Sequence, residues 1–268
     1  MILTHRDTFV HKGSSHDICE DFVYEGQNSN FSYIILSDGC SSSSRSDIAS
    51  NLVSLSAHKI LSHWAMTNRE GIPLEEFEDS MLRNMKSMKE YFHLGNNFDA
   101  TLLVAYEFND VLNIKCFGDG IFGIKLKDKP WKFYSVDYSD NTPYYLSYRM
   151  NNNLDEQYKK VTRQKTIDMY DVNDKCLLSV VGESDFDKNI HLKFPAEDVE
   201  SVILASDGLK SFSFNGTTKY LSDVLLDLVS FKNFEGSFLK RRLNRMIKDY
   251  NPMNNYDDVS VCIMRSKS

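Results

Sequence analysis

Acidic residues recur in this sequence at points where apolar runs end. Asp38 follows the run YIILS and Asp207 follows VILAS, so we expect each carboxylate at the end of a buried strand. A carboxylate in such a place costs free energy unless it is paired or binds a metal ion. Further acidic positions near predicted strand ends are Glu20-Asp21, Asp119 and Asp257-Asp258. Together, these residues indicate a metal-binding cluster more specifically than any one of them alone. A single Asp-Gly after a strand is also an ordinary turn.

The ligand chemistry of such a cluster favours Mg²⁺ or Mn²⁺. The sequence contains neither a Cys-x-x-Cys pair nor a His-Glu-x-x-His motif, which are common zinc-binding patterns. Aspartate oxygens, together with a backbone carbonyl and water molecules, suit Mg²⁺ or Mn²⁺. Two such ions about 4 Å apart can hold a bridging hydroxide and clamp a phosphoryl group during in-line attack.

Composition excludes several other classes of protein. The net charge of -7 argues against a nucleic-acid-binding protein, and the longest basic run, Lys240-Arg241-Arg242, fits the solvated face of a helix. The five cysteines are odd in number, which fits free thiols in a reducing cytoplasm. No run approaches the roughly 18 apolar residues of a membrane span, and no signal-peptide pattern is visible. We therefore expect a cytoplasmic monomer that binds neither membrane nor nucleic acid.

The first third of the chain predicts two strands followed by two helices. The β-rich run 31–37 is one strand and ends at Asp38. After a serine-rich loop, a helix should begin near Ser46 or Asp47, which are good N-cap residues. A second helix is expected at about 74–92. The apolar stripe of the first helix is predicted to contain Ile48, Leu52, Leu55, Ile60 and Trp64, with Lys59 as its one break.

The middle of the chain reads as a β meander. Asn109-Asp110 and Asp119-Gly120 are typical hairpin turns. Residues 137–175 are polar with weak periodicity, so we expect a long loop or flap with a short helix. The strands of the meander are expected at 98–108, 111–118, 121–126 and 131–136.

The last third predicts further strands at 176–182, 201–206 and 258–264. Helices are expected near 219–230 and 236–250. In the second of these helices, Leu239, Leu243, Met246 and Tyr250 share one face. With 41% hydrophobic residues, no visible repeat and no linker, residues 1–268 are expected to form one α/β domain.

Several short motifs, in this order, resemble the metal-dependent protein phosphatases of type 2C (the PPM family), most closely their bacterial branch. The resemblance implies an α/β (α+β) fold. This fold is a four-layer αββα sandwich of two mainly antiparallel sheets flanked by helices. Residues 137–200 carry little of the match. The motifs are GSSHDICEDF (13–22), ILSDGCSSSSRSDIAS (35–50), FDATLLVA (98–105), GDG (118–120), ILASDGLKSF (203–212) and YDDVSV (256–261).

The resemblance also implies roles for the acidic residues. Asp38 would bridge two Mg²⁺ or Mn²⁺ ions, and the Gly39 carbonyl would ligate one of them. Asp207 and Asp257 would ligate the other, which makes Asp38, Asp207 and Asp257 the expected catalytic residues. Among the remaining acidic residues, Glu20 and Asp21 would hold metal-bound waters, or one of the two would be a direct ligand.

Asp119, together with Asp207, resembles the weaker third metal site of the family. Its other interpretation, a carboxylate in a plain hairpin turn, stays open.

Two positions depart from the pattern of animal family members. At the position where animal members have a phosphate-binding arginine, this chain has His16. A histidine could donate one hydrogen bond to phosphate, but it lacks the bidentate guanidinium of arginine. The alternative for His16 is a solvated loop residue. Arg45 is either a substitute phosphate-binding residue or a surface charge at the start of a helix. Where animal members have a histidine after Asp-Gly, this chain has Cys40. We interpret Cys40 as a small packing residue rather than a nucleophile, because no glycine-rich phosphate cradle surrounds Arg45.

The sequence thus predicts a Mg²⁺- or Mn²⁺-dependent phosphatase of phosphoserine and phosphothreonine. Its expected partners are phosphorylated proteins and a cognate serine/threonine kinase. The alternative is a pseudophosphatase that uses the same fold as a binding module. The acidic residues at 38, 207 and 257 favour the enzyme, since a scaffold does not need clustered carboxylates.

Overall fold

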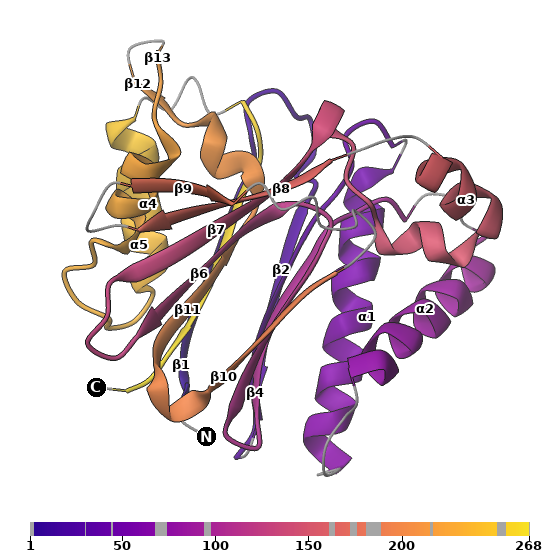
Figure 1. Cartoon of the computed structure of the whole chain (residues 1–268), viewed down its shortest axis with the longest axis horizontal. Helices are drawn as coiled ribbons and strands as arrows, with labels where there is room; N and C mark the ends of the chain where they lie inside the picture. The colour runs from indigo at the N-terminus through magenta and orange to yellow at the C-terminus, as the bar shows by residue number, and fades with distance from the viewer. Residues whose placement is uncertain are drawn as a thin grey trace.

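The computed structural model describes residues 3–29, 31–43, 45–67, 74–93, 98–160, 164–171, 176–180, 189–214, 217–250 and 256–267. Two antiparallel sheets pack face to face, and a pair of helices covers the outer face of each, as Figure 1 shows. The four-layer αββα sandwich expected from the sequence is therefore confirmed. No helix among the described residues is long and apolar enough to cross a membrane.

The larger sheet has seven strands in the order β1-β14-β11-β6-β7-β8-β9. The acidic residues at 207 and 257 lie next to its inner strands, β11 and β14. The strands are β1 (His5–His11), β6 (Gly120–Leu126), β7 (Trp131–Tyr138), β8 (Lys165–Asp171), β9 (Cys176–Val180), β11 (Val199–Ala205) and β14 (Val259–Arg265).

The smaller sheet has five strands in the order β10-β5-β4-β3-β2, and a separate two-stranded ribbon joins β12 to β13. Asp38 is the last residue of β3, an inner strand. The strands are β2 (Asp21–Gln27), β3 (Phe31–Asp38), β4 (Leu102–Phe108), β5 (Val111–Phe117), β10 (Ile190–Pro195), β12 (Ser213–Phe214) and β13 (Thr217–Thr218).

Three apolar cores hold the layers together. One lies between the two sheets and includes Ile34, Leu103 and Leu204, all fully buried. A second lies beneath α1 (Ser46–Thr67) and α2 (Leu74–Tyr91). The third lies beneath α4 (Leu221–Val229) and α5 (Phe238–Asp249). Each sheet is thus buried on both faces, which fixes the positions of its strand ends.

Several predicted elements are confirmed with small changes at their ends. Asn109 and Asp110 both have positive φ (49° and 58°), as the tight turn of a β4–β5 hairpin requires. The strand predicted at 98–108 begins only at Leu102. Leu239, Leu243 and Met246 are buried in α5 and Tyr250 packs against them, as the predicted apolar face requires.

The predicted buried face of α1 is wrong by about one residue. Ile48, Leu52 and Leu55 are only half-buried, whereas Ala49, Val53 and Ala57 are fully buried. Small alanine and serine side chains allow the helix to approach the five-stranded sheet closely, so they occupy the inner face although they are less hydrophobic. Ile60 and Trp64 are buried as predicted.

The segment predicted as a long loop or flap, 137–175, contains more regular structure than expected. It includes the short helix α3 (Asn152–Lys160), as predicted, and two 3-10 helices, η1 (Ser139–Asn141) and η2 (Leu146–Met150). It also includes β8, which pairs with β7. The strands β1 and β10 were likewise not delimited from the sequence, and residues 172–175 lie outside the described part.

Candidate functional site

The ends of inner strands deliver four aspartates to one cavity. Asp38 ends β3, Asp119 lies in the turn between β5 and β6, Asp207 begins the 3-10 helix η4 (Asp207–Ser211), and Asp257 precedes β14. All four line a cavity of about 310 Å³, together with Gly39. The structure therefore brings together five of the eight residues proposed for the site from sequence.

Backbone contacts explain why Asp38 lies at this cavity. The Asp38 N–H donates to Thr101 Oγ1 (3.1 Å), and the Thr101 N–H donates to the Asp38 carbonyl (2.8 Å). At Gly39, which is bridged to Ala100, a Cβ atom would lie 2.4 Å from the Ser46 carbonyl oxygen. The residue after Asp38 must therefore be glycine for the start of α1 to pack against the strand end.

A second close contact fixes Asp207. A Cβ atom on Gly208 would lie 1.8 Å from the Asp258 carbonyl oxygen. In the same region, the Ser206 N–H donates to the Ser260 carbonyl (3.0 Å). The start of η4 thus packs directly on the backbone that precedes β14, and this packing places Asp207 and Asp257 on the same cavity.

Asp21 is an almost completely buried carboxylate of the cluster. It lies directly opposite Asp38 in the β2–β3 pairing and is 2% exposed. No hydrogen bond of ordinary geometry reaches either of its carboxylate oxygens, although the nearby side chains of Ser260 and Ser206 partly offset the effect of burial on its pKa. Burial raises the pKa of Asp21 to about 7. A buried charge without a partner is costly, so Asp21 fits a place beside a cation or its bound water.

The aspartates also destabilise one another's ionised forms. Burial, followed by the charges of Asp21, Asp207, Asp257 and Asp119, raises the pKa of Asp38 well above its ordinary value. Burial and the charge of Asp207 raise the pKa of Asp119 to about 7. The same two causes, in the same order, raise the pKa of Asp257 to about 6. A divalent cation in the cavity would reverse this effect by favouring the ionised carboxylates.

The donor set suits a hard cation, although it does not form a complete protein cage. No group of three or more His, Cys, Asp or Glu side chains in the described residues is arranged as a finished metal site. Mg²⁺ and Mn²⁺ accept backbone carbonyls and waters as their remaining ligands, so fewer side chains are sufficient. The unpartnered oxygens of Asp21 and the mutual repulsion at Asp38 fit such a cation.

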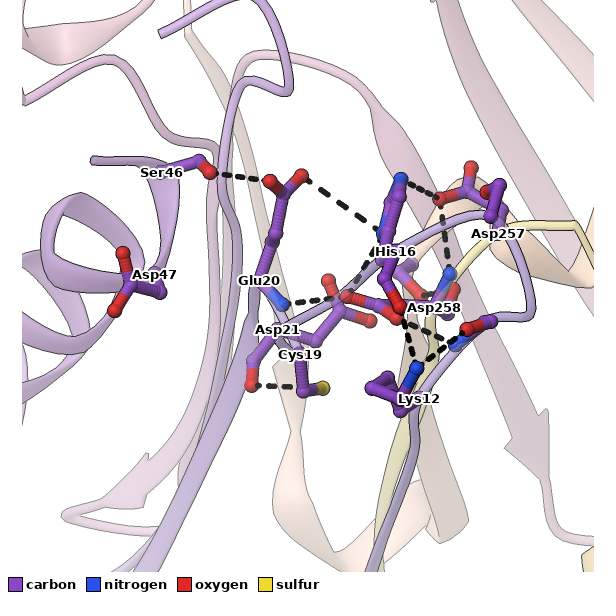
Figure 2. Close-up of polar contacts among 12 residues, drawn as sticks. Lys12, His16, Cys19, Glu20, Asp21, Ser46, Asp47, Asp257 and Asp258 are labelled. Atoms are coloured by element: carbon purple, nitrogen blue, oxygen red, sulfur yellow. Dashed lines mark hydrogen bonds and ion pairs between the residues drawn. The ribbon is translucent and has the colours of Figure 1, made fainter. Parts of the chain in front are cut away.

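Glu20 and His16 are not among the residues that line the cavity, and Figure 2 shows their side chains facing each other near Asp257 and Asp258. The Ser46 hydroxyl, at the start of α1, donates a hydrogen bond to Glu20 Oε1. The other oxygen, Oε2, is buried without a hydrogen-bond partner and lies 3.9 Å from His16 Nδ1. Glu20 is therefore held by the helix that follows Asp38 and keeps one oxygen available.

Asp258 connects the segments of this region. It is 2% exposed, and its carboxylate accepts hydrogen bonds from the backbone N–H groups of Gly13 (2.6 Å) and Glu20. His16 Nδ1 lies 3.2 Å from Asp258 Oδ2, as drawn in Figure 2. The sequence analysis had assigned no role to Asp258. Its only signal was its place next to Asp257, and its partners are more than 230 residues away.

Both ring nitrogens of His16 lie near carboxylates, so the side chain is not free of other contacts on the side where phosphate would bind. Its Nε2 atom lies 3.9 Å from Asp257 Oδ1, and its Nδ1 atom faces Asp258. Burial lowers the pKa of His16, but the carboxylates of Asp258, Glu20 and Asp257 outweigh burial and raise it. His16 is thus not a solvated loop residue. When protonated, it places a positive charge beside the acidic cluster.

Cys40 lines the cavity, whereas Arg45 does not. The Cys40 sulfur lies 3.0 Å from the Ser42 hydroxyl, and the Cys40 N–H donates to the Asp99 carbonyl (2.9 Å). Arg45 is exposed at the start of α1. Cys40 is therefore at the surface of the cavity and not in the apolar core, which differs from the packing role expected for it.

The segment after β7 contributes the remaining wall of the cavity through Asn141, Pro143 and Tyr145. Two contacts anchor this wall, one to the loop before β4 and one to α2. Ser147 Oγ donates to Asp99 Oδ1 (2.8 Å), and Arg149 forms an ion pair with Glu78 of α2 (2.7 Å). Sequence analysis did not identify these wall residues, because the segment carries little of the family resemblance.

Comparison with known proteins agrees with this fold. The fold is similar to that of the serine/threonine phosphatase Stp1 from Staphylococcus aureus (TM-score 0.57, 14% identity, covering 100% of this chain and 96% of that one). It is also similar to the Mycobacterium tuberculosis serine/threonine phosphatase PstP/Ppp (TM-score 0.56, 14% identity, 100% of both chains). A third similar structure is that of the S. agalactiae serine/threonine phosphatase (TM-score 0.55, 15% identity, covering 98% of this chain and 99% of that one).

At these identities the solved structures show the fold alone. No curated protein matches the sequence. The family model described as protein phosphatase 2C, however, matches residues 11–248, which is most of the chain. The chain therefore belongs to the protein phosphatase 2C family.

Proposed function

We propose that the protein is a Mg²⁺- or Mn²⁺-dependent protein serine/threonine phosphatase, built as one domain, which acts on phosphorylated proteins. The observation that supports this most directly is the convergence of Asp38, Asp119, Asp207 and Asp257 on one cavity. The repulsion within this group raises the pKa values of Asp38, Asp119 and Asp257, and a divalent cation bound in the cavity would relieve it.

Asp38 would contact both of two ions, with the Gly39 carbonyl on one and Asp207 and Asp257 on the other. When bound, the ions would supply a hydroxide-like water and positive charge at the phosphoryl oxygens. Among the chain's own residues, Glu20 and Asp21 would orient water through their unpartnered oxygens. Asp119, which faces Asp207, would belong to a weaker third site, although a turn carboxylate remains its simpler role.

His16 would act on the phosphate side of the site. The raised pKa of this histidine keeps more of it protonated, and a protonated imidazole can donate to a phosphoryl oxygen. Its Nδ1 atom faces Asp258, so the Nε2 atom is the one left to reach the substrate. A cognate kinase would supply the phosphorylated proteins.

A phosphate-release assay tests this function. Purified protein should hydrolyse a phosphothreonine or phosphoserine peptide with Mn²⁺ or Mg²⁺ and not with chelator, and equal turnover in chelator would contradict the metal-dependent mechanism. Asp38→Asn should lose about 100-fold or more of kcat/KM, which corresponds to about 2.7 kcal/mol. The matched control is Asp198→Asn, an exposed residue outside the cavity, which should keep normal turnover.

A pseudophosphatase remains the second candidate, because the site departs from the pattern of animal family members at His16 and Cys40. Metal titration by calorimetry separates the two functions. A pseudophosphatase that retains the site would bind Mn²⁺, and its Asp38→Asn variant would not. It would nevertheless release no phosphate from any peptide. A protein that neither binds metal nor turns over would contradict both the assigned ligands and the enzyme.

A further inference from the structure

A groove on the outer helical layer carries a charge opposite to that of the whole protein. Two hollows, of about 230 and 520 Å³, share Ser230, Lys232, Arg242 and Arg245 in their linings, so they form one continuous groove. It lies along α5 and the loop that joins α4 to α5. This helical pair is on the outer face of the seven-stranded sheet (Figure 1).

The groove is strongly basic, although the chain has a net charge of -7. Its acidic lining residues are Asp227 and Asp249. Asp249 is paired with Arg245 at 3.5 Å, and Asp227 lies 3.6 Å from Arg242. These two carboxylates leave a positive excess. The basic lining residues are Lys219, Lys232, Arg241, Arg242 and Arg245.

Two of the basic side chains are held in place by hydrogen bonds. Arg241 donates to Asn233 Oδ1 (2.7 Å) and to the Glu235 carbonyl (2.6 Å), and Arg242 donates to the Asp227 carbonyl. Burial lowers the pKa of Arg242, Asp227 opposes this, and the neighbouring charge of Arg245 lowers it again. An anion in the groove would relieve this repulsion between cations without any rearrangement.

The groove also has apolar walls, which favours a peptide over a nucleic acid or a membrane. The partly exposed rings of Phe231 and Tyr250 line the two hollows, and the buried side chains of Phe238 and Met246 lie beneath them. A long polyanion would additionally meet the net negative charge of the rest of the protein. A short acidic peptide can place carboxylates on the arginines and apolar side chains against these walls.

The groove is connected to the catalytic cavity by direct contacts. The Lys219 ammonium lies 5.5 Å from the centroid of the Tyr250 ring, and Tyr250 packs edge-on against Phe212 (5.7 Å between centroids). Phe212 directly follows η4, the element that begins with Asp207. A peptide in the groove would therefore lie against the same structural unit that carries a cavity carboxylate.

We propose that this α5 groove binds an acidic peptide segment of a partner protein, with carboxylate or phosphate groups on Lys232, Arg242 and Arg245. This binding is separate from the proposed phosphatase reaction and does not need metal ions. It would hold a phosphorylated partner next to the cavity and raise its local concentration there.

Fluorescence anisotropy with a labelled ten-residue glutamate-rich peptide tests the proposal, at low salt and in chelator. Wild-type protein should bind this peptide, and a glutamine-for-glutamate version should bind about tenfold more weakly or not at all. Lys232→Glu/Arg245→Glu should weaken binding about tenfold, since both residues are exposed and line both hollows. The matched control Lys240→Glu/Lys248→Glu changes the same charge on exposed positions of the same segment and should weaken binding less than twofold.

Several results would overturn the proposal. Equal weakening in the two double variants would mean that only overall charge matters, and equal binding of the glutamine peptide would mean that the groove does not select anions. Tighter binding of a single-stranded oligonucleotide, or of anionic vesicles, would assign the surface to another partner class. Should the groove variant unfold by circular dichroism, Lys232→Ala/Arg245→Ala provides the same comparison, and unweakened binding by this folded variant would contradict the site.

Discussion

Lys115 offers a sharp test of the electrostatics of the fold, away from the candidate site. It lies on β5 beneath α2, is 1% exposed, and its ammonium is 4.4 Å from the centroid of the Phe77 ring. Burial lowers the pKa of Lys115 to about 7, opposed by Glu78 and assisted by Lys193. In the unfolded chain a lysine titrates near 10.4. Between these two values the unfolded state binds more protons than the folded state, so stability should rise with pH.

The expected size of this effect follows from the two pKa values. At about 1.4 kcal/mol per pH unit for one proton, the free energy of unfolding should rise by about 2 kcal/mol from pH 7 to pH 9 because of Lys115 alone. Lys115→Met keeps the length and apolar contacts of the side chain but removes the buried titrating amine. The free energy of unfolding of the variant should lack this rise between pH 7 and pH 9. The variant should also be more stable than wild type at pH 7 by about 1–3 kcal/mol.

Urea unfolding at pH 7, 8 and 9, followed by circular dichroism, measures both quantities. Other groups also titrate in this range, so the difference between wild type and variant at each pH is the relevant value. Lys132→Met serves as the control, because Lys132 is an exposed strand lysine and its loss should leave the pH dependence unchanged. Parallel pH profiles for wild type and Lys115→Met would refute the reasoning that Lys115 is buried in its neutral form.

Three further predictions concern the candidate site. Cys40→Ala should keep most turnover and lose little stability, and loss of chemistry in a folded variant, measured with a phosphopeptide, would identify Cys40 as essential. His16→Ala should raise KM while leaving Mn²⁺ affinity by calorimetry nearly unchanged, and an unchanged KM would make His16 a bystander. Asp258→Ala should lower the free energy of unfolding by about 2–4 kcal/mol, because the buried N–H groups of Gly13 and Glu20 lose their acceptor. Urea unfolding measures this change, and a decrease in the free energy of unfolding below about 1 kcal/mol would contradict the role of Asp258 as the acceptor for these N–H groups.

The parts of the site that were predictable from sequence are those with a local signal. Asp38 and Asp207 each follow an apolar run, and a run of that kind predicts a buried strand without knowledge of its partners. Turn residues such as Asn109-Asp110 are similarly local, because their positive φ values depend on residue type. The order of the motifs then identified the family, and the family supplied the fold.

The features that sequence did not predict depend on contacts between distant residues. The inner face of α1 is set by how closely a helix of small residues can approach β3, and a hydrophobic stripe does not contain that information. Asp258 acquires its partners only when the loop that carries His16 lies beside the start of β14. The wall residues Asn141 and Tyr145 belong to a polar segment whose sequence has weak periodicity.

The repulsion within the carboxylate cluster is difficult to relieve by movement. Asp38 ends β3, which is hydrogen-bonded on both edges by β2 and β4, and Asp207 follows β11, which is held between β14 and β6. Both strands are packed on both faces by apolar cores, so the two strand ends cannot separate without loss of core contacts. Protonation or a bound cation must therefore compensate the charge. Because a ligand that binds only the folded state adds about 2.7 kcal/mol at one hundred times its Kd, saturating Mn²⁺ should stabilise the fold most at a pH where these carboxylates are ionised.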